Sequence, residues 1–61
     1  MSLGMFYAVP KAGGAQAFRS PYDAMRALDR LGVEGDIYTG TTEKREHLGH
    51  RKANGEWTYA S

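Results

Sequence analysis

The clearest periodic pattern of apolar and polar positions lies in the middle of the chain. Its apolar members recur at helical spacing and are Ala24, Met25, Leu28 and Leu31. Ser20 before this stripe is a good N-cap, and Pro21 suits the first helical position. Asp23 stands where a capping box would place an acid, and Gly32 stands where a left-handed C-cap is favoured. The pattern predicts a helix over residues 21–31.

Two short segments before this helix read as strands. Residues 5–9 are apolar and rich in aromatic and β-branched side chains, which is typical of a buried strand. Pro10 should end that strand because proline cannot donate to a ladder. The glycine-containing loop 11–14 then leads into residues 15–18, which we predict to pair with the first strand as a hairpin.

Alternation continues after the helix. Residues 36–41 read as a strand with Ile37 and Thr39 on one face and Tyr38 on the other. The following residues, 42–48, fit a turn, a short helix or a strand, and their pattern does not choose between these.

The strongest hairpin signal is Asn54-Gly55, which separates residues 48–52 from residues 56–60. A two-residue turn of this kind requires positive φ at both positions. On the last strand, Trp57 and Tyr59 should share a face.

Together these elements run strand, strand, helix, strand, strand, strand. This order predicts an α+β fold, a small antiparallel sheet of three to five strands with one α-helix packed on one face. The core should bury Met25, Leu28 and Leu31 against Ile37 and either Phe6 or Tyr7.

With 61 residues the chain is long enough for one domain. Residues 1–4, followed at once by Met5, look like an expression leader, so the domain is expected to cover residues 5–61. A chain of this size buries only about 60% of its unfolded surface, and it has no cysteine for disulfides or thiolate metal sites. Association with a partner or with a second copy is therefore one route to stability.

Composition excludes several function classes. No apolar run approaches the roughly 20 residues of a membrane span, and no signal peptide is visible, so a cytoplasmic location without membrane contact is expected. The formal net charge of +1 argues neither for nor against nucleic acid.

We expect no metal, no cofactor and no catalysis. His47 and His50 are three residues apart, and in a regular strand they would point to opposite faces and could not chelate together. Gly13-Gly14 lacks the helix and the following lysine of a phosphate-binding loop. No serine has a plausible base beside it.

A basic segment over residues 44–52 carries the main functional signal. Its cationic members are Lys44, Arg45, Arg51 and Lys52, with His47 and His50 among them. Trp57 and Tyr59 would face this segment across the hairpin, and basic residues beside aromatics are what nucleic-acid binding uses. The alternative is a solvated hairpin whose two aromatic side chains complete the core.

The N-terminal half carries a family resemblance. Its residues are Phe6-Tyr7-Ala8-Val9, Lys11, two glycines, Phe18 and Ser20 before a helix. Over residues 6–41 this pattern resembles the viroplasmin-type domain at the N-terminus of eukaryotic-type ribonuclease H. The resemblance implies a small sheet with helices that binds double-stranded RNA or RNA–DNA hybrids. It also implies that Tyr7, Lys11 and Phe18 could contribute to the binding surface.

Two function hypotheses follow. The first is a small non-enzymatic module that binds RNA, an RNA–DNA hybrid or another nucleic acid. Its predicted binding residues are Tyr7, Lys11, Lys44, Arg45, Arg51, Lys52, Trp57 and Tyr59. The second is a protein-interaction module, or a small regulator or inhibitor, that docks by its sheet edge or helix face, with self-association as a further possibility.

Overall fold

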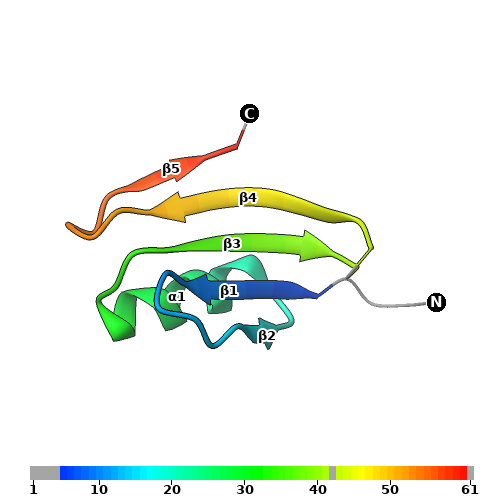
Figure 1. Cartoon of the computed structure of the whole chain (residues 1–61), viewed down its shortest axis with the longest axis horizontal. Coiled ribbons are helices and arrows are strands. Elements are labelled where there is room, and N and C mark those ends of the chain that lie inside the picture. The colour runs from blue at the N-terminus through cyan, green and yellow to red at the C-terminus, as the bar shows by residue number, and fades with distance from the viewer. Residues whose placement is uncertain (1–4, 42, 61) are drawn as a thin grey trace.

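In the computed structural model, residues 5–41 and 43–60 are described, and one helix crosses one face of a five-stranded antiparallel sheet (Figure 1). The elements are β1 (Phe6–Pro10), β2 (Gln16–Phe18), α1 (Pro21–Leu31), β3 (Gly35–Gly40), β4 (Arg45–Arg51) and β5 (Trp57–Tyr59). The strands lie in the order β2-β1-β3-β4-β5, so β2 and β5 form the two edges. This confirms the predicted α+β class, whereas the expected leader at residues 1–4 lies outside the described residues.

The helix begins and ends where its sequence signals place it. The Ser20 hydroxyl accepts a hydrogen bond from the Asp23 amide at 3.1 Å, which satisfies one of the free N–H groups of the first turn. Gly32 adopts φ 68° and donates its amide to the Leu28 carbonyl, and this ends the helix in a left-handed cap.

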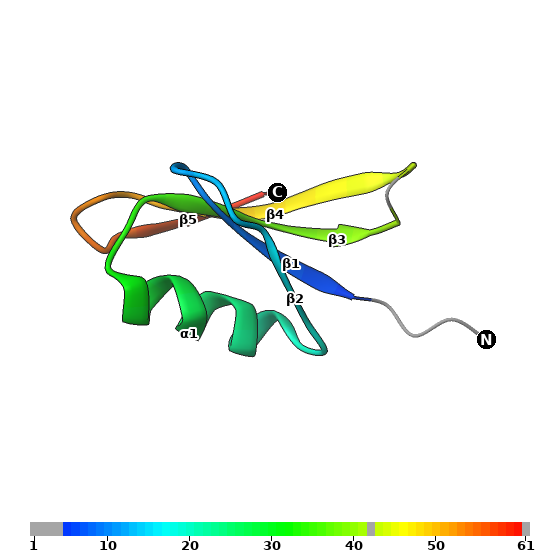
Figure 2. The ribbon, with the colours of Figure 1, turned by 60° about the horizontal axis from the view of Figure 1, so that its bottom comes forward.

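The core lies between α1 and the sheet, and the helix contacts β1, β2 and β3 (Figure 2). Its fully buried apolar members are Ala8, Ala24, Leu28 and Ile37. Gly35 is required beneath the helix, because a Cβ there would lie 2.8 Å from the Val9 carbonyl oxygen and 3.0 Å from Leu28 Cδ2. The close approach of helix and sheet therefore depends on a missing side chain.

The predicted core is right for Leu28 and Ile37, and Phe6 is the correct one of the two alternatives on β1, but Leu31 is wrong. Leu31 is 59% exposed, because it lies at the last turn of the helix, beyond the sheet residues that cover Leu28. Tyr7 does not meet the helix. Its strand neighbour Ala8 is buried opposite Ile37, so alternation turns Tyr7 to the other face.

The pairing of β3 with β4 contains a β-bulge. Ile37 pairs with Gly49 and Tyr38 pairs with His47, so Leu48 is an extra residue between two ladder positions. Leu48 packs against the core. The bulge also changes the phase of β4, which places His47 and His50 on the same face of the sheet and corrects the expectation that they point apart.

The β4–β5 hairpin is confirmed, but its turn type is different from the predicted one. The Gly55 amide donates to the Lys52 carbonyl at 2.9 Å, and Gly55 adopts φ 97°. Among the described residues no other type than glycine has positive φ, so Asn54 does not share this conformation. The loop therefore has three residues, Ala53, Asn54 and Gly55, and only the last of them has positive φ.

Residues 43–48 contain a tight turn and then the start of β4. The Thr41 hydroxyl accepts from the Lys44 amide at 3.0 Å, and the Thr41 amide donates to the Lys44 carbonyl at 3.1 Å. A helix in this segment is therefore excluded for the described residues, and Thr42 lies outside them. No helix in the described part of the chain is long and apolar enough to cross a membrane.

Candidate functional site

The face of the sheet opposite α1 carries no helix, and we call it the open face (Figures 1 and 2). Strand alternation and the register place Tyr7, Val9, Asp36, Tyr38, Arg45, His47, His50 and Thr58 on it. Tyr7 and Tyr38 stand directly opposite each other on the neighbouring strands β1 and β3. The open face therefore has an aromatic pair at the centre of the sheet.

Side chains from β4 surround Tyr38. The Arg45 guanidinium carbon lies 5.9 Å from the centre of the Tyr38 ring, within the range of a cation–π contact. The His47 ring centre lies 5.3 Å from the Tyr38 ring centre, at an interplanar angle of 58°. Arg45 makes no ion pair with a described carboxylate, so its charge is available to a ligand.

A chain of histidines and carboxylates continues across the open face. His47 Nε2 and His50 Nδ1 each lie 2.8 Å from the same oxygen, Asp36 Oδ1. His50 Nε2 lies 3.1 Å from Glu34 Oε2, and Lys11 Nζ lies 3.5 Å from Glu34 Oε1. These contacts connect the end of β1, the start of β3 and the middle of β4.

The charges of this network are mutually supporting. The hydrogen bond to Asp36 raises the pKa of His50 above its ordinary value; the negative charges of Asp36 and Glu34 add to the rise, and partial desolvation opposes it. Desolvation by burial tends to raise the pKa of Asp36, but hydrogen bonds and charge from His50 and His47 outweigh it and leave that pKa lowered. The structure thus favours an imidazolium between two carboxylates.

This network is not arranged as a metal centre. Among the described residues, no group of three or more His, Cys, Asp and Glu side chains has the geometry to hold a metal ion. Both histidines are aimed at one carboxylate oxygen and are held by it, which is the geometry of charge-assisted hydrogen bonds.

The structure divides the predicted binding residues between the two faces. Tyr7 and Arg45 lie on the open face, and Lys11 adjoins it through Glu34. Lys44 lies in the turn directly before β4. Lys52 lies in the hairpin loop at the opposite end of β4 and pairs with Glu56 at 3.7 Å.

The structure places Arg51 differently from the predicted binding residue, because its charge is not exposed to solvent. It is 9% exposed on the helix side, with Nε donating to Asp29 Oδ1 at 2.8 Å and Nη1 donating to the Val33 carbonyl at 3.0 Å. The Trp57 indole N–H donates to the same Asp29 oxygen at 3.3 Å. Arg51 on β4 and Trp57 on β5 thus connect these two strands to the last turn of the helix by hydrogen bonds.

Trp57 and Tyr59 share a face as predicted, but that face is not the open one. Their ring centres are 6.5 Å apart with an interplanar angle of 10°. They flank a small apolar hollow of about 110 Å³ that also touches Pro21, Met25 and Leu48. Trp57 packs against the core, whereas Tyr59 is 65% exposed at the sheet edge.

The predicted set of binding residues did not include Tyr38, Asp36, Glu34, His47 or His50. The alternation of residues 36–41 contained the signal for Tyr38, since it placed that ring opposite the core residue Ile37. No local pattern indicated the two carboxylates, because their histidine partners come from another strand.

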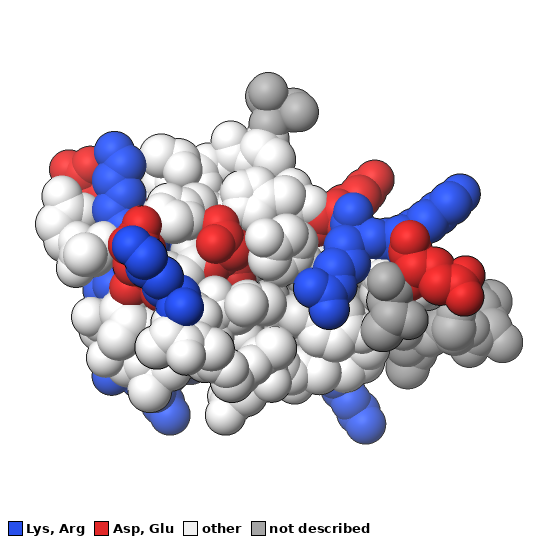
Figure 3. Space-filling view, in the orientation of Figure 1, with Lys and Arg blue, Asp and Glu red and all other residues white. Residues whose placement is uncertain are grey.

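The charged groups of the open face do not form one continuous basic patch. In Figure 3, which views this face, most Lys and Arg atoms lie in two groups towards opposite ends of the strands. Acidic atoms lie beside both groups and near the middle of the face. The open face therefore combines separated groups of cations with the half-buried rings of Tyr7 and Tyr38.

Comparisons with protein-family models, with curated proteins and with solved structures found no match to this chain. The viroplasmin-type resemblance therefore remains a prediction that rests on the quoted residues.

Proposed function

We propose that this protein is a small non-enzymatic binding module that takes nucleic acid on its open face. The observation that carries the proposal is the directly opposed pair Tyr7 and Tyr38 on the two neighbouring strands β1 and β3, with Arg45 held over one ring.

Stacking is the principal interaction expected of this arrangement. An unpaired base can stack on a tyrosine ring, and each such contact is worth about 1–3 kcal/mol. In a duplex the bases stack on one another and are not accessible to flat protein rings. The aromatic pair therefore favours a single-stranded segment of RNA or DNA over the duplex or hybrid that the family resemblance implies.

Electrostatics should contribute modestly. Arg45 and Lys44 stand near one end of the face and can each contact one phosphate. Lys11 and His50 are engaged with Glu34, so they offset nearby carboxylates instead of adding a free charge. Affinity should therefore depend only weakly on salt, with a slope of about one or two units.

Fluorescence anisotropy with labelled single-stranded RNA, single-stranded DNA and an RNA–DNA hybrid tests the proposal at low salt. Tyr38→Ala and Tyr7→Ala should each weaken single-strand binding about five- to 150-fold, the equivalent of one lost stack. Tyr59→Ala is the matched control, since this tyrosine is 65% exposed on the other face and should leave binding unchanged.

Arg45→Ala provides a second, independent readout. It should lower affinity for all sequences and reduce the salt slope by about 0.7, the value for one phosphate contact to a single strand. Absence of binding to all three nucleic acids at micromolar protein and low salt would refute the proposal, as would equal losses for Tyr38→Ala and Tyr59→Ala.

A further inference from the structure

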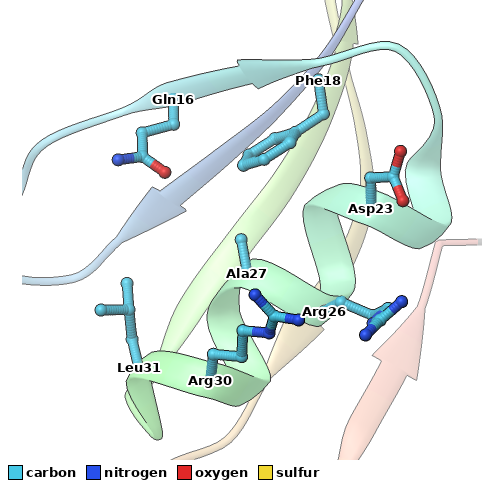
Figure 4. Close-up of a pocket in the computed structure, with 7 residues that line it drawn as sticks. All are labelled: Gln16, Phe18, Asp23, Arg26, Ala27, Arg30 and Leu31. Atoms are coloured by element: carbon cyan, nitrogen blue, oxygen red, sulfur yellow. The ribbon is translucent and has the colours of Figure 1, made fainter.

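A cleft of about 460 Å³ lies between edge strand β2 and helix α1, away from the open face (Figure 4). Its walls come from Gln16 and Phe18 on the strand and from Arg26, Ala27, Arg30 and Leu31 on the helix. In Figure 4 the Gln16 and Phe18 side chains extend from β2 towards the helix, with Ala27 facing them. The cleft is thus bounded by a strand on one side and a helix on the other.

The strand wall has an unused backbone edge. Among the residues that the structure describes, β2 is the outermost strand and pairs with β1 alone, through Phe6–Phe18, Tyr7–Ala17 and Ala8–Gln16. Its outer N–H and C=O groups are free to pair with another extended chain. An added strand would place every second side chain over the cleft.

The chemistry of the walls defines which side chains would fit. Phe18, Ala27 and the 59% exposed Leu31 supply apolar surface for an aliphatic side chain. Arg26 and Arg30 lie one helical turn apart, and neither forms an ion pair with a described carboxylate. Asp23 is the one acid that lines the cleft, so the balance of charge is positive.

We propose that this cleft is a docking site for an extended acidic peptide that adds as a strand to the outer edge of β2. Its aliphatic side chains fill the space between Phe18 and Leu31, and its carboxylates pair with Arg26 and Arg30. The arginines select negative over positive segments, and the backbone pairing supplies affinity without further sequence demands. This site is separate from the open face and does not depend on nucleic-acid binding there.

A synthetic peptide tests the proposal directly. The probe is fluorescein-labelled Thr-Glu-Thr-Val-Thr-Glu-Thr-Val-Thr with blocked ends, which as a strand presents Glu and Val alternately on one side. The comparison peptide replaces both glutamates by lysine. Anisotropy should show binding of the acidic peptide, and the lysine peptide should bind much more weakly.

Arg30→Glu and Lys52→Glu form a matched pair of single charge reversals at exposed positions. Arg30→Glu should weaken the acidic peptide roughly five- to thirtyfold, since it replaces an attraction by a repulsion. Lys52→Glu, in the distant hairpin loop, should have no such effect. Hydrogen exchange followed by NMR should show slower exchange of outward amides in residues 16–18 when the peptide is bound.

Several results would overturn the proposal. These are absence of binding at about 1 mM acidic peptide, equal binding of the two peptides, equal effects of the two charge reversals, or protection confined to β5 or the open face. A further contradicting result would be that single-stranded RNA displaces the peptide and that Arg30→Glu abolishes this displacement. The arginines would then bind nucleic acid.

Discussion

The two faces of the sheet use the same kinds of side chain for different purposes. On the helix side, Arg51 is 9% exposed and gives its guanidinium to Asp29 and the Val33 carbonyl. On the open face, Arg45 from the same strand stands over Tyr38 without an ion-pair partner among the described residues. Only the first contributes its charge to the fold, and only the second keeps it available to a ligand.

The aromatic residues repeat this contrast. Trp57 packs against the core and donates its indole N–H to Asp29, whereas Tyr7 and Tyr38 remain on the uncovered side. A basic or aromatic residue therefore says little about binding until its face of the sheet is known.

The largest effect should come from removing core packing under the helix. Leu28→Ala at a fully buried position should lower the free energy of unfolding by about 2–5 kcal/mol, which could unfold a domain this small. Leu31→Ala is the control on the same helix, because Leu31 is 59% exposed. Urea denaturation followed by tryptophan fluorescence measures both, and equal losses would contradict the placement of these leucines.

The next effect compares the two arginines of β4. Arg51→Ala should cost about 1–3 kcal/mol, since it removes charged hydrogen bonds and leaves Asp29 and the Val33 carbonyl without that partner. Arg45→Ala should change stability by no more than about 0.5 kcal/mol. The same urea titrations decide, and a larger loss for Arg45→Ala would reverse the assignment of the faces.

The smallest effect concerns pH and belongs to the open face. Folding raises the pKa of His50, so its stabilising contribution is full below the ordinary histidine pKa of about 6.5 and is lost as pH rises through the raised value. Folding lowers the pKa of Asp36, so the contribution of Asp36 to stability is lost only in acid, as pH falls through the lowered pKa. The melting temperature should therefore fall slightly from about pH 6 to about pH 9.

Asp36→Asn identifies the source of this slope. It removes the carboxylate that both histidines contact, so the melting temperature of the variant should change less over the same pH interval. An unchanged slope in Asp36→Asn would show that another group is responsible.

Features that depend on a few neighbouring residues could be read from the sequence. The bounds of α1 follow from Ser20, Pro21 and Gly32, which act on backbone groups within one turn. The faces of β3 follow from simple alternation around Ile37 and Tyr38. The hairpin was located correctly by Asn54-Gly55, but its turn type depends on how the strands meet, and the prediction of two positive φ angles was wrong.

The binding surface depended on information that no local pattern contains. Alternation along β4 could not show which of its side chains lie on which face, because the bulge at Leu48 arises only when β4 pairs with β3. That one extra residue brings His47 and His50 to the same oxygen of Asp36. It is also needed for Arg45 and Arg51 to lie on opposite faces, since residues six apart share a face in an unbroken strand.

By itself the sequence determined the helix and the class of fold, because capping and periodicity act over a few residues, whereas it left the start of β4 and the number of strands open. The tertiary structure decided which cations and rings remain available to a ligand. The carboxylates of Asp29, Asp36 and Glu34 contact partners that belong to other elements of the fold. Such contacts join residues 11 to 28 positions apart, and their geometry depends on the register of the whole sheet.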